Sequence, residues 1–163
     1  MAIENLADLF LHTLKATYCA EHRIENALPK LIPKIADGKL RGLFEEQLDE
    51  TSVQIGRLRR VFGLLDKKAQ KKRCQAIIGH ISEAEQLMAE IDDPVVRDAA
   101  LIASAQAFKN YEIVRYSNLC SWADEMGHTN IRDLLKETLL EEMEVDFKLD
   151  QLGADNFNYH AMS

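Results

Sequence analysis

Residues 45–58, EEQLDETSVQIGRL, carry a line of amides and acids beside the expected buried face of a helix. That apolar face is marked at helical spacing by Leu48, Thr51, Ile55 and Leu58. Gln47, Glu50 and Gln54 repeat the same three-and-four spacing along the neighbouring line. Side chains four residues apart project from one side of a helix. The line therefore offers oxygen atoms that could bind a cation or join a hydrogen-bonded network.

The pattern around Glu50 recurs later in the chain. A shift of 92 positions lays LFEEQLDETSVQIGRL at 43–58 over LKETLLEEMEVDFKLD at 135–150, with five identical positions. Glu50 and Gln54 then match Glu142 and Asp146. A shift of 91 places Glu112 over Glu21, although little else around this pair is shared. The two shifts describe two helical hairpins with related acidic positions.

The repeat predicts one acidic cluster at mid-bundle. We expect the long helices to bring together Glu21, Glu50, Glu112 and Glu142. Four carboxylates cannot stay ionised and unpaired in an apolar core, because repulsion and desolvation oppose it. They must stay partly protonated, pair with Arg57, Arg115 or Lys15, or surround a cation. Oxygen ligands suit Mg, Ca and Mn, and carboxylate bundles with some imidazole suit a pair of irons.

A simpler interpretation stays open. A glutamate that borders an apolar stripe usually lies on a solvated flank of its helix. The Glu-x-x-His motif of di-iron bundles is also missing, since positions 53 and 145 are both valine. His22 follows Glu21 but points about 100° around the helix, away from the cluster.

Apolar periodicity predicts the elements that must position these acids. Long helices are expected at about 3–32, 40–65, 94–126 and 129–152, with a shorter helix at about 70–91. Asp93-Pro94 is a strong helix start, and Gly127 a strong helix end. Short turns within each pair and a long middle connection predict an all-α, ferritin-like four-helix bundle with one crossover. We expect residues 1–153 to form this single domain and residues 154–163 a flexible tail.

Composition limits the class of protein. The 163 residues are 47% hydrophobic and carry a net charge of −7, which disfavours non-specific nucleic-acid binding. No stretch is long and apolar enough to span a membrane, and the acidic start is unlike a signal peptide. Cys19, Cys74 and Cys120 are too widely spaced for a metal motif and are expected to be small buried thiols. A cytoplasmic protein fits these features best.

Several segments carry a family resemblance. They are TYCAEHRIENALPKL (17–31), LDETSVQIGRL (48–58), VRDAALIASAQ (96–106), YEIVRY (111–116) and LLKETLLEE (134–142). Together they resemble the YciF branch of the YciE/YciF-like ferritin-like proteins of bacteria, from residue 3 to about residue 152. The resemblance implies a ferritin- or rubrerythrin-type bundle, a homodimer and a link to stress responses. It also implies a two-metal centre of iron or manganese, with no enzymatic reaction assigned.

The resemblance also implies a ligand set. The metal centre would fall on Glu21, Glu50, Glu112 and Glu142, with Asp146 in second place and Gln54 as an amide contributor. This chain departs from the family pattern at three positions. Family members often carry His where Gln47 stands, and Glu-His where this chain has Lys109-Asn110. Amides are poorer donors than imidazole, and an inward lysine would bring positive charge close to Glu112.

Two functions from different classes follow. The first is a carboxylate-lined metal protein of the bacterial cytoplasm that acts in stress protection, with any reaction unassigned. The alternative is a non-catalytic helical dimer or interaction protein, in which a metal-free carboxylate–amide network replaces the centre. The two differ in whether a cation binds between the acids.

Overall fold

The protein is an all-α bundle, described by a computed structural model over residues 2–154. Its elements are α1 (Leu6–Leu31), a 3₁₀ turn (Ile32–Lys34), α2 (Gly38–Leu64), α3 (Gln75–Glu90), α4 (Pro94–Glu125) and α5 (Thr129–Leu152). No strand occurs within the described residues. The all-α prediction is therefore confirmed. Of the predicted flexible tail, residues 155–163 lie outside the described part of the chain.

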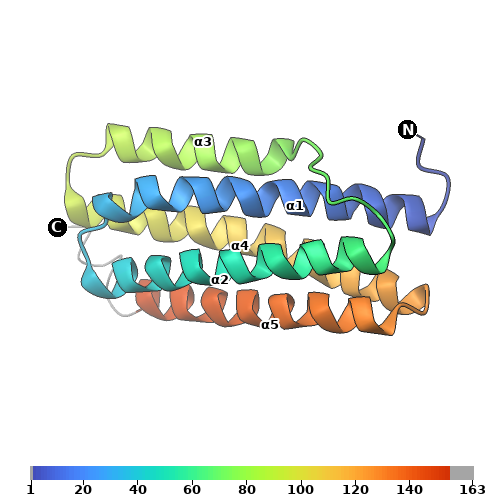
Figure 1. Ribbon diagram of the computed structural model, residues 1–163. Coiled ribbons are helices and arrows are strands. Elements are labelled where there is room, and N and C mark those ends of the chain that lie inside the picture. The colour runs from blue at the N-terminus through green and yellow to red at the C-terminus, as the bar shows by residue number, and fades with distance from the viewer. Residues whose placement is uncertain (1, 155–163) are drawn as a thin grey trace.

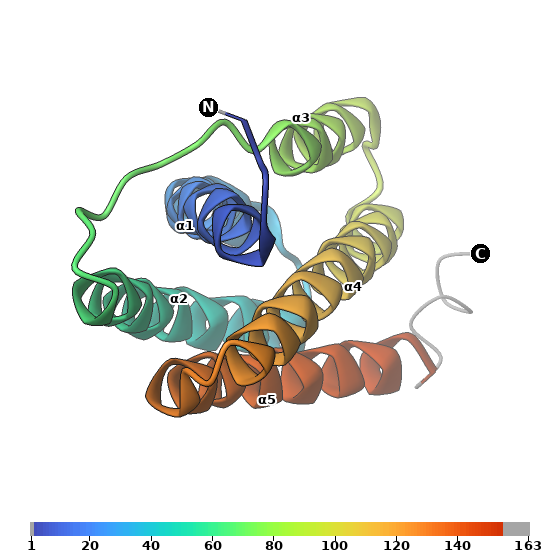
Figure 2. The ribbon, with the colours of Figure 1, turned by 90° about the vertical axis from the view of Figure 1, so that its right-hand side faces the viewer.

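The four long helices form two antiparallel hairpins, α1 with α2 and α4 with α5 (Figure 1). The chain leaves α2, crosses one end of the bundle and enters α3, which lies along α1 and α4 (Figures 1 and 2). α3 thus returns the chain to the end where α4 begins. This is the predicted ferritin-like connectivity, with one crossover that carries the shorter helix.

Helix starts follow from capping side chains. Asn5 accepts a hydrogen bond from the Asp8 N–H at 2.9 Å, so α1 begins at Leu6 rather than near residue 3. Asp93 caps the predicted start of α4 by accepting from two backbone N–H groups. Gly127 follows α4 with a φ of +76°, a left-handed conformation in which glycine is favoured.

The third helix begins later than the periodicity predicted, at Gln75 instead of about residue 70. The segment KKAQKKR at 67–73 would place like charges four residues apart on a helix, where they repel. Helical structure begins only after Cys74, whose side chain is buried. Its Sγ lies 2.7 Å from the Sγ of Cys19, and both thiols are free. The prediction of small buried thiols is correct for this pair, whereas Cys120 is half-buried.

The apolar core has two halves. The first half takes from the four long helices Ile24, Leu28, Leu43, Phe44, Leu101, Ile102, Val145 and Leu149, among others. The second half takes Phe10, Leu14, Ile55, Leu58, Tyr116, Leu119, Ile131 and Leu135, among others. On every long helix, buried polar residues fall between the two halves. A polar layer therefore crosses the middle of the bundle.

Candidate functional site

Each long helix contributes a buried polar side chain to this layer. α1 provides Glu21, α2 provides Gln54, α4 provides Glu112 and α5 provides Glu142, and none is more than 4% exposed. All four were predicted to lie in the centre. The structure brings them together within the core, with Gln54 as the α2 member in place of the Glu50 that the repeat predicted.

A lysine lies among these acids. The Lys109 side chain is 3% exposed, and its Nζ donates to Glu142 Oε2 at 2.5 Å and to Glu112 Oε2 at 3.1 Å. The other oxygen of Glu142 accepts from Gln54 Nε2 at 2.9 Å. Glu142 is thus fully partnered by one cation and one amide. Charge-assisted hydrogen bonds of this kind are among the stronger ones in proteins.

Glu21 is held from the other side of the layer. The Tyr116 hydroxyl donates to Glu21 Oε1 at 2.9 Å, and Tyr116 is fully buried. Lys109, Glu112 and Tyr116 follow each other at spacings of three and four residues on α4. This spacing puts all three on one face of the helix. It was the signal in the sequence that could have identified Lys109 and Tyr116 as members of the cluster.

Burial and neighbouring charges distribute the protons unevenly. Burial, and after it the charge of Glu142, raises the pKa of Glu21 to about 7. The same two causes raise the pKa of Glu112 well above its ordinary value. Burial alone would also raise the pKa of Glu142, but Lys109 and the hydrogen bonds from its neighbours hold it below its ordinary value. These opposite shifts favour the protonated form of Glu112 and the ionised form of Glu142 opposite the Lys109 ammonium.

Lys109 keeps its charge in this setting. Burial by itself would lower the pKa of a lysine, but the adjacent Glu112 and Glu142 outweigh it and raise the pKa above the ordinary value. The ammonium and the Glu142 carboxylate thus form a neutral pair inside the bundle. The raised pKa values of Glu112 and Glu21 reduce the negative charge of the remaining acids.

Two predicted site residues lie at the edge of the cluster. Glu50 is half-buried, and its Oε2 has no partner among the described residues. Burial, followed by the charges of Glu141 and other acids, raises the pKa of Glu50 to about 6. Asp146 is half-buried one turn beyond Glu142, and no hydrogen bond joins it to the cluster within the described part. The structure therefore assembles four of the six predicted residues closely and leaves these two outside.

The pairing cations named from the sequence are not the ones in the cluster. Arg57 pairs with Glu141 at 2.5 Å and with Glu137 at 3.2 Å on the surface of α5. Arg115 lies over the ring of Tyr111 at 4.9 Å. The cluster's own cation is Lys109. That lysine lies one turn from Glu112 and is directed inward. Neither arginine is therefore needed to supply positive charge to the buried acids.

The residues do not fit a metal ion. Between Glu112 and Glu142, where bridging carboxylates would hold a cation, the Lys109 Nζ lies within hydrogen-bonding distance of both. Among residues 2–154, no group of three or more His, Cys, Asp or Glu side chains has the arrangement that could hold a metal. His22 packs edge-on against Tyr18 instead of joining the acids. The donor set is thus acidic, free of imidazole and already charge-balanced.

Within the described residues, no helix combines the length and the apolarity that crossing a bilayer requires.

Comparisons with known proteins agree with the fold. A family model described as a domain of unknown function (DUF892) matches residues 5–162. Protein YciF of Escherichia coli is 38% identical over 162 residues, which cover 99% of this chain and 98% of that protein. The crystal structure of this E. coli stress protein superposes with a TM-score of 0.91 over 96% of this chain and 99% of that chain. The structure of YcfI from Rhodopseudomonas palustris, 42% identical, gives 0.89 over 91% and 94%.

Proposed function

The chain belongs to the family described as a domain of unknown function (DUF892), which includes the E. coli stress protein YciF. On this premise, we propose that it is a non-catalytic stress-response protein with a metal-free centre. Its bundle is held in register by a buried carboxylate–lysine–amide network. The observation that carries the proposal is the position of Lys109 Nζ between Glu112 and Glu142.

Electrostatics supports this proposal over a metal protein. An ammonium in the middle of the cluster supplies the positive charge that the acids need in a medium of low dielectric constant. A divalent ion at the same place would have to displace Lys109, whose charge would then be left buried and unpaired. That displacement is costly, because an isolated buried charge loses its solvation without compensation.

Family resemblance supports the same conclusion. Family members often carry His where this chain has Gln47, and Glu-His where it has Lys109-Asn110. The differences at Gln47 and Lys109 each remove a buried metal donor, whereas Asn110 lies on the surface, and Lys109 also adds a competing cation. We infer that this chain keeps the bundle and replaces the metal with its own side chain. The homodimer and the cytoplasmic location stay predictions.

The metal content of the purified protein tests the proposal. We expect protein from cells supplemented with iron or manganese to hold less than about 0.1 equivalent of either metal per chain. A variant that restores the family pattern, Gln47→His with Lys109→Glu and Asn110→His, should retain metal and gain thermal stability when metal is added. Elemental analysis and thermal melts measure both effects. A matched control, Lys136→Glu, changes an exposed lysine and should stay metal-free.

A stoichiometric amount of metal in the unaltered protein would overturn the proposal. So would an increase in melting temperature of the unaltered protein on addition of Fe²⁺ or Mn²⁺, because such an increase reports binding to the folded state.

A further inference from the structure

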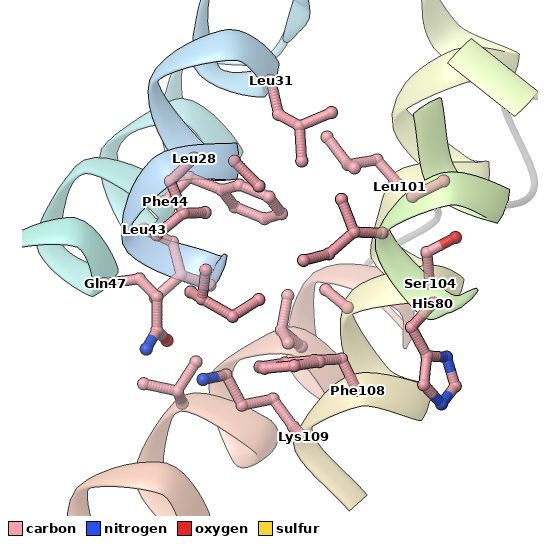
Figure 3. A pocket seen from close by; sticks show the side chains of 17 residues that line it. Leu28, Leu31, Leu43, Phe44, Gln47, His80, Leu101, Ser104, Phe108 and Lys109 are labelled. Atoms are coloured by element: carbon pink, nitrogen blue, oxygen red, sulfur yellow. The ribbon is translucent and has the colours of Figure 1, made fainter. Parts of the chain in front are cut away.

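An apolar cavity lies beside the carboxylate–lysine cluster. Its volume is about 70 Å³, and its walls include Ile24, Leu28, Leu31, Phe44, Leu101 and Phe108. At one end of this cavity lie the side chains of Gln47 and Lys109, while the ring of His80 is directed away from it (Figure 3). The cavity thus has a long apolar wall and a single polar end.

The polar end contains an amide without a partner. Gln47 is 6% exposed, and neither its Oε1 nor its Nε2 has a hydrogen-bond partner among the described residues. Gln54, two turns further along α2, donates instead to Glu142 and Glu141. Leaving a buried amide unpaired is costly, which favours a partner inside the cavity.

The charges around the polar end select the kind of partner. The Lys109 ammonium is already paired with the Glu142 carboxylate, so an anionic head group would lose its hydration without a free counter-charge. A cationic head group would also meet the Lys109 ammonium itself. A neutral hydroxyl or carboxamide avoids both costs. It can donate to Gln47 Oε1 and accept from Gln47 Nε2, so it satisfies both atoms of the amide.

We propose that this cavity binds a small neutral amphiphile, with an aliphatic body in the apolar part and a hydroxyl or carboxamide group on Gln47. A cavity of about 150 Å³ holds the six carbons of benzene, so this cavity of about 70 Å³ suits a body of roughly three carbons. The inference goes beyond the proposed function, because it assigns a ligand class to the region next to the cluster. It stands on the cavity and Gln47, and does not depend on the metal content.

Nuclear magnetic resonance titration of the full chain tests this site with three probes of equal carbon count. They are 1-propanol, propanoate and propylamine. We expect 1-propanol to give saturable shifts of the amides around Leu28, Phe44 and Phe108. The two charged probes should give no saturable shift there. Gln47→Met, which is close in size but lacks the amide, should bind 1-propanol about tenfold more weakly, as the loss of one or two hydrogen bonds predicts.

An exposed glutamine provides the matched control. Gln151→Leu should bind 1-propanol as the unaltered protein does. Three outcomes would overturn the proposal: shifts that do not saturate or that lie away from the cavity, equal affinity of the charged probes, and unchanged affinity in Gln47→Met. If Gln47→Met does not fold, the comparison of the three probes on the unaltered protein decides by itself.

Discussion

At the scale of single residues, one lysine changes the chemistry that the acids can perform. Glu21, Glu112 and Glu142 would be a plausible oxygen cage for a cation if the fourth side chain in contact with them were another acid. Because it is Lys109, the cluster is balanced from within. The balance is incomplete at Glu21, whose partner is the neutral hydroxyl of Tyr116. Glu21 is therefore the member whose ionisation should be visible in the stability of the fold.

The stability of the protein should fall between about pH 4.5 and pH 7. Glu21 has a pKa of about 7 in the folded state against an ordinary value of 4.5, with burial as the main cause. The folded state therefore holds a proton that the unfolded state releases, and unfolding becomes easier as the pH rises through this window. At pH 8, Glu21→Gln should stabilise the fold by roughly 3 kcal/mol, or roughly 5–10 °C in melting temperature. Melts at pH 5, 6, 7 and 8 measure this.

An exposed acid serves as the control for this prediction. Glu45→Gln should leave the pH dependence unchanged, since Glu45 lies on the surface. Equal melting temperatures of Glu21→Gln and the unaltered protein at pH 8 would show that Glu21 is not buried as described. Below pH 4.5 the sign reverses for Glu142. Its lowered pKa contributes stability that is lost as it becomes protonated.

At the scale of elements, Asp98 joins the first hairpin to α4. Its carboxylate is 2% exposed and accepts from the backbone N–H of Ala36 at 3.1 Å and of Asp37 at 2.8 Å. These two donors lie in the turn between α1 and α2, where helix capping cannot supply partners for them. Asp98 thus fixes the end of the bundle that carries the turn. The segment RDAALIA contains it, but its role depends on a contact across 61 residues that no local pattern reports.

Asp98→Ala should destabilise the fold. The substitution leaves two part-buried N–H groups without their acceptor, and lost hydrogen bonds to a charged group amount to about 2–3 kcal/mol. We expect the melting temperature to fall by roughly 5–10 °C. Asp92→Ala, an exposed acid six residues earlier, is the control and should change it little. Equal melting temperatures of the two variants would rule out the proposed link.

The helices were predictable where local chemistry determines them. Asp93-Pro94 and Gly127 marked the ends of α4 correctly, because capping and left-handed backbone are local properties. The start of α3 was not predicted correctly, because the apolar spacing continues into a segment whose like charges oppose a helix. Periodicity reports which face of a helix can be buried. It does not report the electrostatic cost of bringing like-charged residues together between the apolar positions.

At the scale of the whole molecule, α5 carries an exposed apolar stripe. Leu140, Met143 and Phe147 follow each other at spacings of three and four residues and are 56%, 49% and 61% exposed. Val114, on the adjacent α4, is 59% exposed. Scattered apolar residues are normal on a surface, but a contiguous stripe on one helix favours burial against another molecule. A second copy of this chain is the partner that the family resemblance predicts.

Phe147→Lys should therefore convert a dimer into a monomer. We expect light scattering after gel filtration to give about twice the 18.5 kDa chain mass for the unaltered protein and the single chain mass for the variant. Leu64→Lys, an exposed leucine at the end of α2, should remain dimeric. A monomer before substitution would contradict the homodimer, and a dimer after it would show that the interface lies elsewhere.

The sequence predicted the location of the site better than its chemistry. The internal repeat matched Glu50 with Glu142 and Gln54 with Asp146, whereas in the structure Gln54 donates to Glu142 and both Glu50 and Asp146 lie at the edge of the cluster. The repeat could not settle the direction of the Lys109 side chain. A long flexible side chain at the edge of the buried face of a helix can reach either the core or the solvent. That direction depends on packing between α4 and α5, which only the tertiary structure determines. The choice between a metal and a metal-free centre rests on it.

Anomalous diffraction tests this choice most directly. Crystals would be grown from protein expressed with added iron and manganese, and data collected at the absorption edges of both metals. We predict no anomalous peak between Glu112 and Glu142, and electron density for the Lys109 side chain reaching both carboxylates. A peak bound by these acids, with Lys109 turned out of the core, would contradict the account.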